Sequence, residues 1–88
     1  MEVKAITGRS TYVFTKEPGG QWILYRHNRS YYHLIQKVTI KRWRKIGFNA
    51  MRYDPLSRQD VNTCYVSSAS RVRKIIVDGK EVKSFTFE

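Results

Sequence analysis

The chain has 88 residues, which allows one domain, residues 1–88, with a single small core. It carries 17 Lys and Arg against seven Asp and Glu, a formal net charge of +10, and this excess works against the compact state by self-repulsion. Because 41% of the residues are hydrophobic and 14% are aromatic, the composition excludes a disordered chain. No apolar run has the length of a signal or membrane-spanning segment, so we expect a soluble, cytoplasmic protein with no membrane partner.

The first predicted elements are two strands joined by a tight turn at Gly8. Val3 and Ala5 share one face of the first strand, and Tyr12 and Phe14 share one face of the second. This alternation with a period of two residues is typical of strands with one buried face, so the segments are expected to form a hairpin.

The next segment, QWILYRHN, follows a Pro-Gly-Gly turn and is apolar on both faces at its centre, as expected of an interior strand. The stretch 31–45 is ambiguous. Leu34 and Val38 approach a helical spacing, whereas the paired tyrosines and the β-branched residues around Ile40 favour strands. We favour strands there, with a short helix in 31–37 as the leading exception.

The last segment, RKIIVDGKEVKSFTFE, predicts a hairpin, because Asp78-Gly79 between two β-rich runs is a strong short-range hairpin signal. In its second arm Val82 is out of step with Phe85 and Phe87, which predicts a bulge near Lys83-Ser84. The whole pattern predicts an all-β protein of about six to eight short strands, arranged as a small barrel or a compact sandwich.

Residues suited to catalysis are sparse. His27 and His33 have no ligands at metal-binding spacing, and the one cysteine, Cys64, is expected to pack in the core and to stay reduced in the cytoplasm. Asp54 and Asp60 flank a turn and are better interpreted as turn and cap residues than as paired catalytic carboxylates. We therefore expect no enzyme activity, no metal and no cofactor.

The basic residues are concentrated in the central third of the chain. From position 26 to position 58 there are nine Lys and Arg and one acidic residue, interleaved with aromatic residues. Cations contact phosphates and aromatic faces stack on unpaired bases, so this interleaving favours a nucleic-acid-binding surface. A second basic run begins at position 71. The candidate binding residues are Arg29, Tyr31, Tyr32, Lys41, Arg42, Arg44, Lys45, Arg52, Arg71 and Arg73.

The run KRWRK, 41–45, is expected to be a strand with Arg42 and Arg44 on the outward face and Trp43 turned inward. Trp22 and Phe48 are expected in the core as well. Tyr31 and Tyr32 are adjacent and face opposite ways in a strand, so one of them must leave the core and is the best candidate for stacking on a base.

The two ends of the chain, MEVKAITGRSTYVFT and SSASRVRKIIVDGKEV, resemble small β-rich proteins encoded by bacteriophages and other mobile elements. The resemblance covers about 30 residues and contains no catalytic or binding motif. It implies a viral or mobile-element origin, action in the host cytoplasm, and functions such as DNA binding, host takeover or inhibition of a defence system. It assigns a role to no residue.

The sequence therefore predicts a module that binds DNA or RNA through its basic, aromatic-interleaved centre. The alternative is a protein-binding module, encoded by a phage or mobile element, whose basic face docks on an acidic host or defence protein; interfaces also favour Tyr, Trp and Arg. A third interpretation is a homo-oligomer in which an edge strand pairs between copies.

Overall fold

The computed structural model describes residues 1–26 and 30–88. These residues form nine strands and no helix, so the described chain contains no helix capable of spanning a membrane. The strands are β1 (Glu2–Thr7), β2 (Thr11–Lys16), β3 (Trp22–Arg26), β4 (Ser30–Leu34), β5 (Val38–Lys41), β6 (Lys45–Asp54), β7 (Gln59–Val77), β8 (Lys80–Val82) and β9 (Ser84–Phe87).

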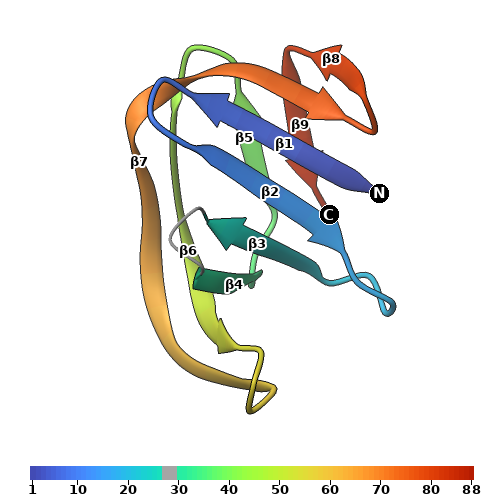
Figure 1. Ribbon diagram of the computed structural model, residues 1–88, viewed down its shortest axis with the longest axis vertical. Helices are drawn as coiled ribbons and strands as arrows, with labels where there is room; N and C mark the ends of the chain where they lie inside the picture. The colour runs from blue at the N-terminus through green and yellow to red at the C-terminus, as the bar shows by residue number, and fades with distance from the viewer. Residues whose placement is uncertain (27–29) are drawn as a thin grey trace.

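The strands close into a ring. Antiparallel pairings connect β1, β2, β3, β4, β6 and β7 in that order, and the second half of β7 returns to pair with β1 (Figure 1). The strand β8 pairs with the end of β7 on the edge opposite β1. The strands β5 and β9 form a separate two-stranded sheet. Closure of this kind removes most exposed strand edges, which matters in a chain so rich in β-forming residues.

The core lies inside the ring and is built from the alternate residues of each strand, including the predicted Val3, Ala5, Tyr12 and Phe14. The last strand closes one end, because Phe87 packs 4.4 Å from the ring of Phe14, centroid to centroid. The core also contains the predicted Trp22 and Phe48, together with Leu24, Val66, Val72 and Ile75. Cys64 packs against this core, partly buried, as a free thiol.

The terminal hairpin is confirmed. Val77 pairs with Lys80, and both turn residues, Asp78 and Gly79, have positive φ (48° and 84°), as a two-residue turn of this hand requires. The phase change after Val82 is an exchange of partner rather than a bulge: β8 pairs with β7, the strand breaks at Lys83, and β9 pairs with β5. The break lets Val82 and the two later phenylalanines all reach the core.

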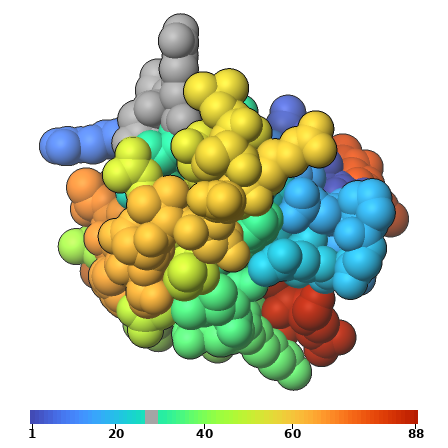
Figure 2. Space-filling view, turned by 90° about the horizontal axis from the view of Figure 1, so that it is seen from below, coloured from blue at the N-terminus to red at the C-terminus, as the bar shows by residue number. Residues whose placement is uncertain are grey.

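The hairpin of β6 and β7 extends beyond the ring as an arm. Residues 59–63 of β7 are all exposed, and Leu56 in the connecting turn is 95% exposed. In Figure 1 the turn of this arm lies at the opposite end of the molecule from the β5–β6 turn, along an axis of 34 Å. Figure 2 looks onto the arm from its end, where yellow and orange residues of β6 and β7 cover the centre of the view.

The predicted all-β, barrel-like fold class is confirmed, with nine strands in the described residues instead of six to eight. The alternative of a helix in 31–37 is wrong, because residues 30–34 form β4 between β3 and β6. Residues 32–34 of β4 are all buried, because this interior strand is covered on both faces, by the core on one side and around His33 on the other. The predicted turn at 28–30 and the residue His27 fall largely or wholly outside the described residues.

Candidate functional site

The basic run KRWRK is a turn between β5 and β6, so its predicted continuous strand is wrong. The amide of Arg44 donates to the carbonyl of Lys41 at 3.2 Å, which closes a four-residue turn. Trp43 takes a positive φ of 69° and is 54% exposed, so its predicted place in the core is wrong as well. Its amide donates to the carbonyl of Val72 at 2.6 Å, which fixes the turn against β7.

Two adjoining recesses meet at Trp43. The first is lined by Trp43, Arg44, Lys45 and Arg71, and the second by Lys41, Arg42, Trp43, Lys83 and Ser84. We call these eight residues the Trp43 surface. It carries six cations and no acidic residue around an exposed indole ring.

The ring itself is supported on one side. The guanidinium of Arg42 lies 4.9 Å from the centroid of the Trp43 ring, a distance at which a cation is attracted to an indole face. Arg42 is half-buried, and its backbone amide donates to the carbonyl of Lys83 at 2.9 Å. The indole is therefore held by a stacked cation and two backbone contacts while much of its surface stays open.

The carboxylates of the described chain engage elsewhere. The ion pairs among the described residues join Lys4 to Glu2, Lys37 to Glu88, and His33 to two acids, and none of them involves a cation of the Trp43 surface. The positive charge of this surface is consequently not neutralised by ion pairs within the described chain.

The outer face of the β6–β7 hairpin continues the Trp43 surface. Lys45 on β6 pairs with Arg71 on β7, and two residues further along β6 stands Gly47. The ring of Tyr65 lies across Gly47, with its hydroxyl in the space that a β-carbon would occupy and Cζ 3.3 Å from that position. Because Gly47 has no side chain, Tyr65 can lie flat against the sheet while remaining 65% exposed.

The remaining sequence-predicted residues do not all join this surface. Arg73 lies two positions beyond Arg71, with its guanidinium against Gly8 in the β1–β2 turn. Arg52 is near the far end of β6, seven residues or roughly 23 Å along the strand from Lys45. It lines a different recess that contains Tyr31, and Arg29 lies outside the described residues.

The structure separates the two adjacent tyrosines as expected. Tyr32 is 9% exposed and belongs to the core, so it is not available for stacking. Tyr31 faces the other way, half-buried, with its ring 4.9 Å from that of Tyr25. The prediction that one tyrosine leaves the core holds, but Tyr31 is far from the Trp43 surface, at the arm end of β6, where it pairs with Tyr53.

Sequence reasoning missed three residues of the Trp43 surface, namely Trp43 as an exposed ring, Lys83 and Ser84, and it also missed Tyr65 on the adjoining hairpin face. For Tyr65 a signal was present, since its neighbours Cys64 and Val66 alternate with it and point inward. For Trp43 the signal was the absence of any apolar neighbour within two residues, which is unusual in a strand with a buried face. Lys83 reaches the surface because the chain changes partners there: β8 pairs with β7, and β9 pairs with β5. The sequence indicated only that the alternation of buried residues shifts after Val82.

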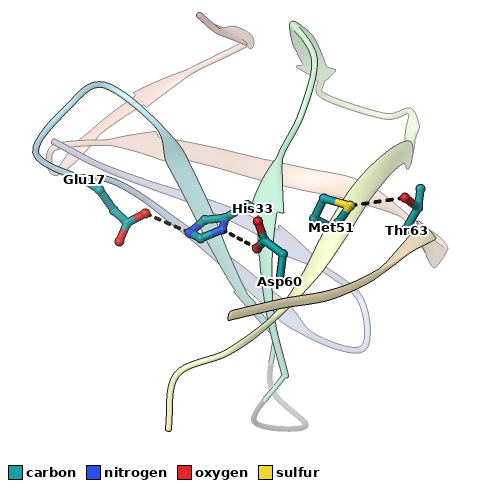
Figure 3. A network of polar contacts seen from close by, with 5 residues as sticks. All are labelled: Glu17, His33, Met51, Asp60 and Thr63. Carbon is teal, nitrogen blue, oxygen red and sulfur yellow. Dashed lines mark hydrogen bonds and ion pairs between the residues drawn. The ribbon is translucent and has the colours of Figure 1, made fainter. Parts of the chain in front are cut away.

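A second polar cluster lies on the outer side of the sheet, away from the Trp43 surface. Nδ1 of His33 is 2.8 Å from the carboxylate of Asp60, and Nε2 is 2.9 Å from that of Glu17 (Figure 3). His33 is buried, and its two partners come from β7 and from the residue that follows β2. Asp60 was expected to be a turn residue, whereas it links strands; Asp54 is a turn residue, as expected, accepting from the amide of Leu56.

This cluster links strands and lacks the features of a metal centre. The described residues contain no group of three or more His, Cys, Asp or Glu side chains arranged to hold a metal ion. Both ring nitrogens of His33 are taken by carboxylates, so neither is open to a third partner.

No protein-family model, curated protein or solved structure gives a significant match to this chain.

Proposed function

We propose that this protein is a nucleic-acid-binding module, without enzyme activity, that holds a single strand on the Trp43 surface. The observation that carries the proposal is the exposed ring of Trp43, surrounded by six cations and by no acidic residue. A single strand offers both phosphates and unpaired base faces, which are the two groups that such a surface attracts.

The strained backbone at Trp43 supports this proposal. A non-glycine residue with positive φ is uncommon, and a bulky one costs of order 1–3 kcal/mol. Burial of the ring does not offset that cost, because the ring is more than half exposed. Strained residues of this kind cluster at binding sites, where the strain presents a side chain to a ligand.

The arrangement suggests how a strand would lie. One base stacks on the open face of Trp43, whose other side faces Arg42. The phosphates on either side contact the paired Lys45 and Arg71, and the strand continues along the hairpin to Tyr65, which offers a second ring. Each stacked base contributes about 1–3 kcal/mol, and the cations add a salt-dependent term.

Duplex nucleic acid fits less well. The base faces of a duplex are stacked inside the helix, so the exposed ring of Trp43 would have no partner unless a base were flipped out. The two recesses are lined by long side chains at a turn, and the described residues form no helix that could enter a groove beside them. The projecting end of the β6–β7 hairpin lies at the opposite end of the molecule (Figure 1). We propose that the module acts in the cytoplasm, that of the host if a phage or mobile element encodes it.

The test is a titration of the tryptophan fluorescence with single-stranded oligonucleotides, at several salt concentrations, on protein first freed of co-purifying nucleic acid. With about five phosphate contacts, log K should fall against log salt with a slope of about −3.5 for a single strand. The buried Trp22 should respond little, so a Trp43→Phe variant should lose the quenching but keep the slope.

Two controls separate this function from docking on an acidic protein. Polyglutamate carries charge without bases, so it should bind weakly and leave the fluorescence unquenched. An abasic deoxyribose-phosphate strand should bind with a similar slope but less tightly, because stacking is lost. Equal affinity for polyglutamate and the oligonucleotide would favour a protein partner, and a slope near zero would remove the proposal.

A further inference from the structure

One long edge of the sheet is open. Residues 59–71 of β7 pair with β6 on one side, and β1 pairs with β7 only from Val72 onward. Among the described residues, no backbone group of 59–70 forms a backbone–backbone hydrogen bond on the other side. This open edge is twelve residues long, which is longer than any other strand in the part of the chain that the structure describes.

The edge also lacks the charged side chains that usually protect a strand edge against pairing. Natural edge strands carry Lys, proline or bulges that oppose association with another strand. The register of β7 against β6 shifts at Val61 and again at 68–70, so the regular part of the edge is 62–67, between these two irregularities. Residues 59–70 contain neither Lys, Arg nor Pro, and Asp60 is their one charged residue. In a chain with 17 Lys and Arg, this is the longest stretch free of cations. The outward side chains are instead neutral, including Thr63, Tyr65 and Ser67, and all three are exposed.

We propose that this edge pairs with the same edge of a second copy, in antiparallel register, and that the protein is a homodimer. The charge distribution favours a second copy as the occupant. Two chains of +10 repel each other over most of their surfaces, and the cation-free edge is where they can approach with the least repulsion. An antiparallel edge-to-edge contact is self-complementary, as a twofold interface must be.

The pairing would also relate the charges at the two ends of the edge. Asp60 stands near one end and Arg71 just beyond the other. In a regular antiparallel pair centred on Tyr65, Asp60 stands opposite Ser70 and Arg71 opposite Gln59 of the other copy, so no like charges face each other across the interface. The result is a four-stranded sheet of β6 and β7 from both copies, with the outer faces of both hairpins on the same side.

The dimer does not depend on the proposed nucleic-acid binding, but the two are compatible. If the Trp43 surface binds single strands, the dimer carries two such surfaces, and binding to long strands gains from their linkage. Salt distinguishes the two properties. Screening weakens nucleic-acid binding, whereas it reduces the repulsion between copies and strengthens the dimer.

The experiment is sedimentation equilibrium on nuclease-treated protein at low and high salt. Wild type should give twice the chain mass of 10.5 kDa, with tighter association at high salt. The variant Thr63→Lys/Ser67→Lys places like charges opposite each other across the interface and should be monomeric. Its matched control, Thr11→Lys/Thr15→Lys, adds the same charge at exposed positions of β2, both of whose edges are already paired.

Each outcome decides the matter. A monomeric wild type overturns the proposal, as does a Thr63→Lys/Ser67→Lys variant that stays dimeric. If both double variants become monomeric, the added charge alone explains the loss and the edge is not the interface. Circular dichroism confirms that both variants are folded. Oligonucleotide binding is measured separately, with wild type and with the monomeric variant, so that loss of the dimer and loss of binding are seen independently.

Discussion

The guanidinium of Arg42 stacks 4.9 Å from the ring centroid of Trp43, and the two residues form the tip of a turn in which Trp43 has a left-handed backbone. The turn therefore holds an aromatic ring in place at a conformational cost. Stability and binding should therefore respond separately to changes at this position, because the strain affects the first and the ring supplies the second.

Trp43→Gly tests this separation. Glycine adopts positive φ without strain, so the free energy of unfolding should stay within about 1 kcal/mol of wild type despite the loss of a large side chain. Affinity for a single strand should fall by roughly 5-fold to 150-fold, the equivalent of one stacked base. Urea unfolding and fluorescence-anisotropy titration with a labelled oligonucleotide measure the two quantities. A strong loss of stability would show that the ring serves the fold.

The cations can be compared in matched pairs. Lys45→Gln/Arg71→Gln removes two charges from the Trp43 surface, and Arg52→Gln/Arg58→Gln removes two from the arm at the other end of β6. The first variant should reduce the magnitude of the salt slope by about 1.4, since each phosphate contact contributes about 0.7. The second should leave the slope nearly unchanged. Equal losses would mean that binding follows the net charge and that no localised site exists.

Gly47→Ala tests the contact beneath Tyr65. A β-carbon at position 47 would occupy the space of the Tyr65 hydroxyl, so the ring must move away from the sheet. Because Tyr65 is largely exposed and its ring has room to move outward, the cost in stability should be below about 1 kcal/mol. The aromatic NMR signals of Tyr65 should shift, and in the Tyr65→Ala background the same substitution should have no cost. Unaltered signals would place the ring elsewhere.

The buried His33 should link three parts of the closed sheet, namely β4, β7 and the residue that follows β2. It can donate to both Asp60 and Glu17 only when both ring nitrogens carry hydrogen. The acids are about 40% exposed, so solvent weakens each pair, and we expect Asp60→Asn and Glu17→Gln each to cost about 1 kcal/mol. A double-mutant cycle between these acids should give coupling through His33. Additive losses would mean that the two bonds act independently.

The local parts of the fold were predictable because they depend on neighbours in sequence. The alternation of Val3 and Ala5 and the Asp78-Gly79 turn place strands and hairpins correctly. The Trp43 surface depends on contacts between distant segments. Trp43 is anchored to Val72, and Lys83 reaches the recess because β9 leaves its hairpin to pair with β5. Strand pattern places an isolated tryptophan in the core, and only these long-range pairings turn it outward.

The turn at the tip of the arm gives a prediction that involves neither binding nor dimerisation. Asp54 accepts hydrogen bonds from the amide of Leu56 and from the hydroxyl of Ser57, both at 3.0 Å. These bonds favour the charged carboxylate, so they hold the pKa of Asp54 below its ordinary value of 3.8, the Leu56 amide having the larger effect. NMR titration of the side-chain carboxyl carbons should show this displacement directly.

The sign of the effect on stability follows from that direction. A carboxylate whose pKa is lower in the folded chain than in the unfolded chain stabilises the fold above the unfolded value, and this contribution is lost as the pH falls through the folded value. In Ser57→Ala one donor is absent, so the pKa of Asp54 should rise toward 3.8 while the Leu56 bond keeps it below. Ser10→Ala alters a distant turn and should leave the titration unchanged. A pKa of Asp54 at or above 3.8 in wild type would show that the turn does not hold its carboxylate in this way.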